Sequence, residues 1–315
     1  MEFTSFTELV RKEVSKRMGE GYSMQLNDVR KNNGIVLRGL TVLEDNDNIS
    51  PTIYLNQYFN MYANGKMTFT NIIDSVIDTY HKNKISKNTD LRHFLNYGQV
   101  KPRIIYKVIN TEKNRELLED IPHVEFLDLS IVFEYMVDQE GFGVATILIY
   151  NTHQKMWNIT TDMLYQAAIE NTQELLPYEI KPMTEILCEL MEAENPGQFD
   201  HDTCMKEFSD SVPMYVLSNK SRVEGAVCML YPDILRNFAE TIDSDYYIIP
   251  SSIHELLLLP TEKDDQRREI KGMIKDINDT QVSNEEILSY SLYFYNSYFP
   301  HQNKPLPLVT RGFDP

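Results

Sequence analysis

Apolar residues recur along this chain at two spacings, and each spacing predicts a different backbone structure. Residues 6–14, 72–80 and 270–277 have apolar side chains three and four positions apart, the pattern of a helix with one buried face. Ser5 and Glu8 form a capping-box pattern at the start of the first of these helices. Further helices are predicted after the caps at Ser50-Pro51 and Thr160 (to Asn171), and over residues 182–193 and 231–241.

Alternating apolar and polar residues predict strands, most of them in hairpins. The longest alternation, Leu127–Val137, is followed by a turn at Asp138–Gly141 and by Val144–Tyr150, which predicts two antiparallel strands, the first with one buried face. Asn33-Gly34 is a strong hairpin signal, because both residues tolerate the positive φ of a tight turn. The remaining predicted strands are 22–30 with 35–43, 214–218 with 225–230, 246–249 with 254–259, and a last strand at 289–295.

This order of elements predicts an α+β fold. Hairpins followed by helices favour predominantly antiparallel sheets with helices covering one face, whereas a doubly wound parallel sheet would alternate single strands with helices. Residues 82–120 are polar and broken, apart from the apolar stretch Ile104–Val108, and are expected to form mostly short helices. We therefore expect an N-terminal α+β domain over residues 1–120, a C-terminal α+β domain over 121–296, and a poorly ordered, proline-containing tail over 297–315.

The composition indicates a folded protein with an acidic surface. Of the 315 residues, 42% are hydrophobic and 24% are charged, which is enough apolar material for a large core. The formal net charge is −17, and residues 185–210 contain eight acidic residues against one lysine. Nucleic acids are bound mainly through Lys and Arg contacts to phosphates, so direct binding of DNA or RNA is not expected. The acidity instead favours solubility or a protein partner, with imitation of DNA as a further alternative.

Targeting segments and cysteine chemistry do not stand out. No apolar run approaches the roughly 20 residues that cross a bilayer, and residues 1–14 lack the apolar centre of a signal peptide. Cys188, Cys204 and Cys228 are odd in number and widely spaced, unlike a disulfide framework or a zinc knuckle. We therefore expect a cytoplasmic protein with no membrane partner.

Several segments, in order, resemble those of a known family. They are Asn32–Gly34, Asn48–Leu55, Phe126–Leu129, Ala145–Asn151, Met156-Trp157, Pro213–Asn219 and Pro250–Glu255. Together they resemble the uncharacterised bacterial domain-of-unknown-function family 5688, over residues 1 to about 295. The resemblance implies a cytoplasmic bacterial protein, and it brings no activity, cofactor or catalytic residue with it.

One predicted turn contains residue types that could carry out chemistry. Pro250–Glu255 places Ser251, Ser252 and His254 between two apolar strands. A serine beside an imidazole can act as a nucleophile, so Ser252 and His254 are the candidate catalytic pair. The alternative is a structural turn, in which the serines bond to local backbone and His254 packs at the start of a strand. The sequence contains no glycine-flanked nucleophile elbow to support the catalytic alternative.

Three further residues are candidates for lining a pocket. Asn151, His153 and Trp157 follow a predicted strand, and Trp157 either walls a pocket or fills the core. Asp200–Cys204 offers oxygen, nitrogen and sulfur ligands, but it lies in a predicted loop without the rigidity of a metal centre, so no metal site is predicted. The glycine motifs that bind phosphates are absent, and no cofactor is predicted.

The leading hypothesis is a non-enzymatic interaction or regulatory protein that presents an acidic loop, residues 194–210, and aromatic surfaces to an unknown protein partner. One alternative is a hydrolase or transferase that uses Ser252 and His254. A second alternative is an acidic inhibitor that imitates DNA. Whether the protein is an enzyme stays open at this stage.

Overall fold

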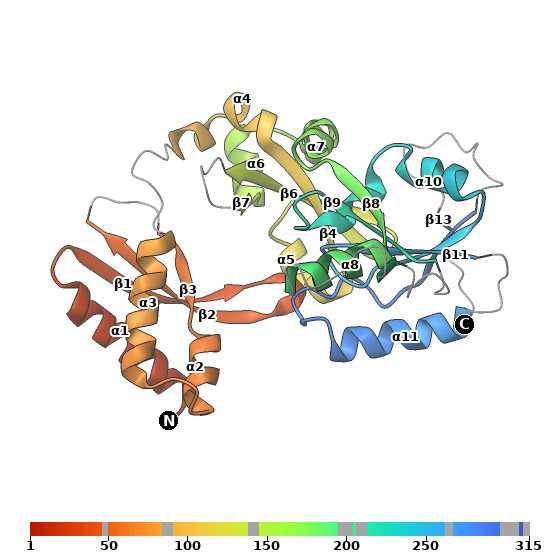
Figure 1. Ribbon diagram of the computed structural model, residues 1–315. Helices are drawn as coiled ribbons and strands as arrows, with labels where there is room; N and C mark the ends of the chain where they lie inside the picture. Colours follow the sequence, from red (N-terminus) through yellow and green to blue (C-terminus); the bar gives the residue numbers. More distant parts are fainter. Residues whose placement is uncertain are drawn as a thin grey trace. The chain divides into compact units, whose positions relative to one another are not determined.

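The computed structural model describes residues 1–45, 50–83, 91–137, 145–194, 204–205, 213–261, 267–296 and 309–310. The chain forms two compact units, residues 1–93 and 94–315 (Figure 1). Each unit combines antiparallel sheets with helices, which confirms the α+β class. The division lies at residue 93/94 and not at 120/121, because the strand Ile104–Asn110 pairs with Leu129–Val137 inside the second unit. The expected tail lies outside the described residues, apart from Val309 and Thr310.

The first unit is a three-stranded antiparallel sheet packed against helices. Its strand order is β1-β2-β3, and the β1–β2 turn contains the short helix η1. Asn33 and Gly34 in this turn have φ values of 59° and 70°, so the predicted hairpin is confirmed. Phe6, Leu40 and Ile73 meet in the core of the unit. The elements are α1 (Phe3–Met18), β1 (Tyr22–Arg30), η1 (Asn32–Gly34), β2 (Val36–Glu44), β3 (Thr52–Tyr54), α2 (Asn56–Ala63) and α3 (Phe69–Asn83).

Two helix starts that were predicted in this unit are wrong. The first helix begins at Phe3, ahead of the capping-box pattern, with Glu2 at the N-cap. The segment after Ser50-Pro51 is the strand β3, and α2 begins only at Asn56. The Ser50 hydroxyl donates to the carbonyl of Val42 on β2 instead of capping a helix. Pairing with β2 and burial of Ile53 outweigh the local capping preference.

A four-stranded antiparallel sheet opens the second unit. β6 (Leu129–Val137) has β4 (Ile104–Asn110) on one side, and β5 (His123–Phe126) and β7 (Ala145–Leu148) on the other. The predicted pairing of β6 with β7 is confirmed, and the turn between them lies outside the described residues. The short helices nearby are η2 (Leu91–Leu95), α4 (Tyr97–Val100), η3 (Lys101–Arg103), η4 (Glu112–Asn114) and α5 (Arg115–Leu118).

The prediction of one buried face for β6 is wrong, because both faces of this strand are covered. Phe133 lies in the main core of the unit, and Val132, on the opposite face, packs in a smaller core with Ile109 and Ile121. The strand also starts later than the alternating pattern, because Leu127 turns the chain with a φ of 57°.

A six-stranded antiparallel sheet forms the rest of the second unit, in the order β13-β12-β10-β11-β9-β8. The predicted β10–β11 hairpin is confirmed. The other late hairpin is wrong: β9 pairs with β8 and β11, and Gly225–Leu230 is the buried helix η5. All six residues of η5 are buried, so an unbroken apolar run here marked a core helix and not a strand. The strands are β8 (Tyr178–Pro182), β9 (Tyr215–Asn219), β10 (Tyr246–Ile249), β11 (Leu256–Pro260), β12 (Tyr293–Tyr295) and β13 (Val309–Thr310).

Helices cover both faces of this sheet. α11 (Arg267–Thr280) packs Ile270 and Ile274 against Tyr247 on one face. α10 (Ile234–Ile242) places Phe238 edge-on to Tyr246 on the other face, with ring centroids 5.0 Å apart. The remaining helices are α6 (Asn151–Trp157), α7 (Thr161–Leu175), whose cap at Thr160 is confirmed by a 3.3 Å bond from the Met163 N–H, and α8 (Met183–Glu194).

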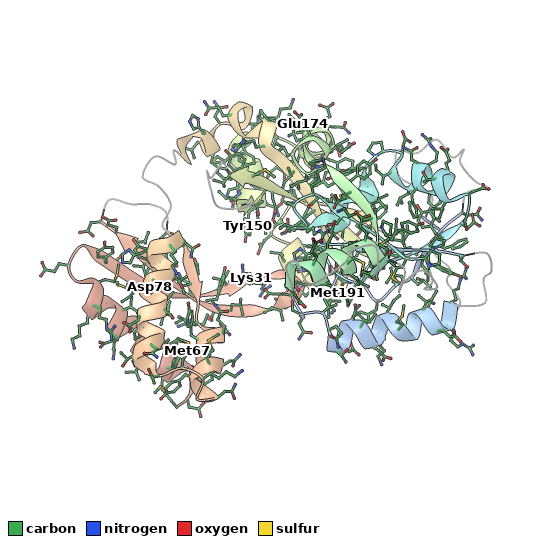
Figure 2. The ribbon with its side chains drawn as sticks, viewed as in Figure 1. Lys31, Met67, Asp78, Tyr150, Glu174 and Met191 are labelled. Carbon is green, nitrogen blue, oxygen red and sulfur yellow. A yellow bond between two sulfur atoms is a disulfide. The ribbon has the colours of Figure 1, made fainter. Side chains whose placement is uncertain are left out.

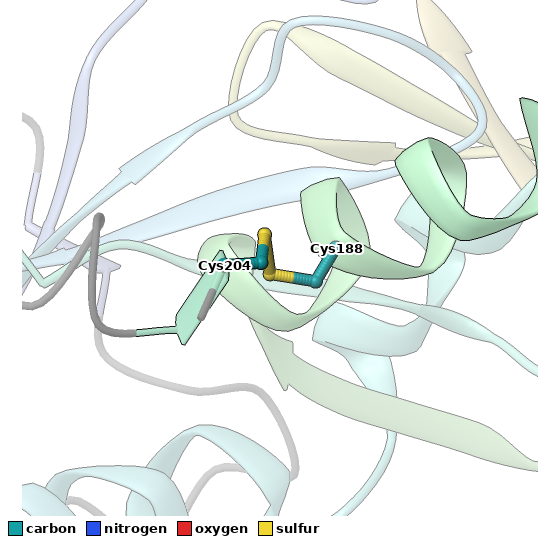
Figure 3. Close-up of a disulfide and its surroundings, with 2 residues drawn as sticks. All are labelled: Cys188 and Cys204. Atoms are coloured by element: carbon teal, nitrogen blue, oxygen red, sulfur yellow. A yellow bond between two sulfur atoms is a disulfide. The ribbon is translucent and has the colours of Figure 1, made fainter. Parts of the chain in front are cut away.

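A disulfide joins Cys188 on α8 to Cys204, with 5.9 Å between their Cα atoms (Figure 3). The expectation that the cysteines form no disulfide is therefore corrected. The spacing of the two cysteines in the sequence did not indicate the pair, because a disulfide depends on how close the two residues lie in the fold. Cys228 is a free, buried thiol within η5.

Candidate functional site

Ser252 and His254 lie in the turn between β10 and β11, and their hydrogen bonds are those of a turn. The Ser252 hydroxyl accepts the backbone N–H of His254 at 3.1 Å. The His254 ring accepts the backbone N–H of Glu224 at Nδ1, also at 3.1 Å, and its Nε2 lies 3.5 Å from a carboxylate oxygen of Glu286. Both ring nitrogens thus face groups other than Ser252, which matches the structural interpretation of this turn. The serine-nucleophile hypothesis stays a prediction.

Asn151, His153 and Trp157 all lie on α6; two of them tie that helix to neighbouring segments, and His153 caps its start. The Asn151 side chain donates to the carbonyl of Glu119 at 2.9 Å, and the Trp157 indole donates to the carbonyl of Phe94 at 2.7 Å. His153 accepts the N–H of Tyr150, which precedes α6 in the sequence and is labelled in Figure 2. The three residues therefore share one helix, and Trp157 is buried in the main core.

Burial also affects the one ionisable group among these three residues. The His153 ring packs edge-on against Phe94, with centroids 4.9 Å apart. Removal from water disfavours the charged imidazole, so burial lowers the pKa of His153 below its ordinary value. A neutral ring that accepts a backbone N–H suits a helix-capping role.

A buried ion cluster, which we define as Lys107, Glu134 and Glu224, is the most unusual polar arrangement in the second unit. The Lys107 ammonium lies 2.5 Å from a carboxylate oxygen of Glu134 and 2.7 Å from one of Glu224. The exposed fractions of the three side chains are 20%, 4% and 18%, respectively. Lys107 and Glu134 share one face of the β4–β6 pair, since Lys107 is opposite Val132, two residues from Glu134. Glu224 reaches them from the turn before η5.

The electrostatics of this cluster favour one extra proton near neutral pH. Burial raises the pKa of Glu224 to about 7, because the attraction of Lys107 is offset by the neighbouring charge of Glu134. For Glu134 the burial effect is overcome by Lys107, which holds the pKa of that carboxyl below its ordinary value. Burial disfavours a charged Lys107, but the two carboxylates outweigh it and raise its pKa. The cluster can therefore take up or release a proton at Glu224 near neutral pH.

The ion cluster and the Ser252–His254 turn meet at Glu224. This residue has a φ of 54°, an uncommon conformation for a residue with a side chain, and its N–H holds the His254 ring. The next residue, Gly225, allows very close packing, because a Cβ there would lie 2.1 Å from the Ser218 hydroxyl and 2.5 Å from the His254 carbonyl oxygen. A side chain at position 225 would therefore clash with both neighbours.

Sequence reasoning missed the ion cluster, although one signal was present. Lys107 interrupts the apolar stretch Ile104–Asn110, and Glu134 interrupts the apolar stretch of β6. A charge within an apolar strand is expected to have a partner, because unpaired charges are rarely buried. Glu224 carried no comparable signal, since it lies in a polar turn.

An open groove of about 560 Å³ lies between α10 and the strands β8 and β9. Its lining is largely apolar and aromatic, and it contains no side chain that is charged at neutral pH. Two polar residues of α10, Asn237 and Thr241, are exposed at this groove. The apolar lining includes Tyr178, Ile180 and Pro182 from β8, Tyr215 from β9, and Phe238 from α10.

Metal-binding clusters and membrane-spanning helices are both absent from the part of the chain that the structure describes. No group of three or more His, Cys, Asp or Glu side chains there is arranged to hold a metal ion. Within the same residues, every helix is too short or too polar to cross a bilayer. Asp200–Thr203, and the acidic loop 194–210 except Glu194, Cys204 and Met205, lie outside the described residues.

Fold and site together define an α+β protein with a buried ion cluster and an open apolar groove. The chain belongs to a family of unknown function (DUF5688), whose family model matches residues 3–297. The resemblance seen in the sequence is thereby confirmed. Comparison with curated proteins and with solved structures gave no match.

Proposed function

We propose that this protein is a non-enzymatic interaction protein that binds a protein partner in the groove between α10 and β8–β9. The observation that carries the proposal is the open, uncharged, aromatic lining of that groove. Apolar surface of this kind is costly to leave in water, and binding a partner removes it from water. A regulatory role for the protein in the cytoplasm would follow from the identity of that partner.

The composition of the groove supports a protein ligand. Its volume of about 560 Å³ is that of an ordinary ligand pocket and leaves room for a few side chains of a partner. Aromatic residues are enriched and charged residues depleted at the centre of protein interfaces, and the lining has the same bias. Tyr178 retains 44% of its surface exposed, so one aromatic ring is already presented to a ligand.

Photo-crosslinking in the cells that produce the protein tests this proposal. Tyr178 is replaced by benzoylphenylalanine, and we expect irradiation to join the protein to one partner at this position. Adding Asn237→Trp, which fills the groove from an exposed position on α10, should abolish the product. Lys271→Trp, an exposed position on α11 that does not line the groove, is the matched control and should leave the product unchanged.

Two results would overturn the proposal. One is the same cross-linked product in the presence of Asn237→Trp, which would place the partner elsewhere. The other is the absence of any product from Tyr178 while other surface positions of the protein do yield one.

A further inference from the structure

We propose that the groove receives an extended segment of the partner, which adds to β8 as a further antiparallel strand and carries basic residues at its ends. This inference rests on the proposed function and names the class of ligand. It follows from the backbone edge of β8, from the side chains that the same residues present, and from the charge of the surrounding elements.

The backbone of β8 has one side free to pair. β8 ends the six-stranded sheet, and among the described residues no strand pairs with its outer edge. Lys220 donates its N–H to the carbonyl of Pro177, and Met183 donates to Met214, so residues 177, 179, 181 and 183 face β9. Because the backbone groups of an antiparallel strand alternate in direction, those of Tyr178, Ile180 and Pro182 face outward.

The same three residues line the groove. Tyr178, Ile180 and Pro182 present their side chains on the face towards α10, whereas Lys181 on the other face forms ion pairs with Glu185 and Glu189 of α8. A strand that pairs with β8 continues the alternation of side chains across the sheet. Its residues opposite the groove-lining positions therefore point into the groove, so the ligand needs apolar side chains at every second position.

Charge distinguishes the partner from other occupants. Residues 178–194 contain five acidic residues and one lysine, and residues 233–245 contain four acidic residues and one arginine, giving −4 and −3. The second segment includes α10, which lines the uncharged groove, and the first includes α8, which packs on the other face of β8. Basic residues at the two ends of a bound segment therefore gain longer-range attraction while its centre stays apolar. A second copy of this chain that paired β8 with β8 would bring like charges together. The C-terminal strand β13 lies at the opposite edge of the sheet, away from β8.

Nuclear magnetic resonance of the full chain with a short peptide tests the inference. The parent peptide is Lys-Lys-Leu-Thr-Leu-Thr-Leu-Lys-Lys, with companions in which Val or Phe replaces Leu. We expect binding to shift the amide protons of Tyr178 and Ile180 downfield and to slow their exchange with water, because these two groups acquire acceptors. Methylation of the peptide amides that face β8 should weaken binding at least about tenfold, since hydrogen bonds are lost and the strands cannot approach.

One further peptide, together with the methylated one, tests the charge of the ligand separately from strand addition. A peptide with Glu in place of every Lys should bind at least about tenfold more weakly at low salt, and equal binding would overturn the basic-ligand assignment. Equal binding by the methylated peptide, with unchanged exchange at Tyr178 and Ile180, would overturn strand addition.

The outcome for strand addition can be told apart from that for the proposed function. If Asn237→Trp abolishes the cross-link to the partner but the methylated peptide binds like the parent, the groove still binds a partner and only strand addition fails. If Asn237→Trp leaves peptide binding unchanged, the groove is not the site and this inference fails with it. No binding by any of the Leu, Val and Phe peptides also overturns strand addition.

Discussion

Lys107 is the residue on which the interior electrostatics of the second unit depend. Its ammonium lies within hydrogen-bonding distance of two carboxylates that are themselves largely buried. Removing one partner of such a group leaves a charge without compensation, which is generally more costly than removing the whole group. The cluster therefore restricts which single substitutions the unit can tolerate, and it makes one carboxyl group sensitive to pH.

Glu224 should make the stability of the protein depend on pH between about 4.5 and 7. Its pKa in the fold is about 7, raised from 4.5, so its proton stabilises the fold at low pH. This stabilisation is complete below about pH 4.5 and is lost as the pH rises through about 7. The loss amounts to about 3 kcal/mol, at about 1.4 kcal/mol for each pKa unit. We expect urea unfolding to show this decline in the free energy of unfolding.

The variant Glu224→Gln separates the titration of Glu224 from the titration of other groups in the protein. A glutamine cannot lose a proton, so the decline between about pH 4.5 and pH 7 should disappear while stability at about pH 5 changes little. Glu134 does not obscure the result, because its lowered pKa affects stability only at lower pH. An equally steep decline in the variant would show that Glu224 is not the group that titrates.

The Ser252–His254 turn also permits a test at the scale of single residues. Because the His254 ring accepts from Glu224 and faces Glu286, we expect no labelling of Ser252 by a fluorophosphonate probe. Mass spectrometry of the probed protein measures this directly. Labelling of Ser252 that disappears in His254→Ala would instead support the hydrolase or transferase alternative.

At the scale of elements, the connection from β9 to η5 is held by local hydrogen bonds and close packing. Asn219 is fully buried and its side chain holds the turn by donating to the carbonyl of Val223 at 2.7 Å and accepting from the Ser221 hydroxyl at the same distance. Gly225 then passes close to Ser218 and to the β10–β11 turn. Local bonds and close packing thus join the neighbouring elements β9 and η5 to the β10–β11 turn, which lies 30 residues further along the chain at His254.

Alanine substitutions at two glycines should have opposite effects on stability. Gly225→Ala forces a Cβ to within 2.1 Å of the Ser218 hydroxyl and 2.5 Å of a backbone oxygen, so we expect a loss of about 1–3 kcal/mol or more. Gly272→Ala on α11 meets nothing within 4 Å and should add about 0.5–1 kcal/mol through helix propensity. Urea unfolding of both variants measures the difference, and equal stabilities would contradict the packing at Gly225.

At the scale of the whole molecule, the chain consists of two units with separate cores. Phe6, Leu40 and Ile73 belong to the core of residues 1–93, and all the described residues of that core lie within this unit. The strand β4 belongs entirely to the second unit, where it is buried against β6. The position of the boundary therefore decides whether a fragment carries a strand without its partner.

We expect residues 1–93 to fold alone as a monomer. A fragment of residues 1–120 should instead expose Ile104–Asn110, whose partner strand is missing, and should associate or precipitate. Circular dichroism and size-exclusion chromatography of the two fragments measure the difference. A monomeric, fully folded fragment 1–120 together with an unfolded fragment 1–93 would support the boundary expected from the sequence.

The sequence by itself determined features that depend on neighbouring residues. The Asn33-Gly34 hairpin, the Thr160 cap and the helix over residues 72–80 were all predicted correctly. A turn with positive φ, a side chain that accepts a nearby N–H and a periodic apolar face are set by a few residues along the chain. The α+β class followed from the order of such elements.

Only the tertiary structure decided the features that join distant residues. The segment Thr52–Tyr54 became a strand because β2 offered it a partner, and Gly225–Leu230, which is buried over its whole length, forms a helix packed beside β9 and β4 instead of a strand. The ion cluster of Lys107, Glu134 and Glu224, the groove beside β8 and the Cys188–Cys204 bond all arise where separate elements meet. The spacing of residues along the chain does not predict these contacts. They are determined by packing and strand pairing between residues that are far apart in the sequence.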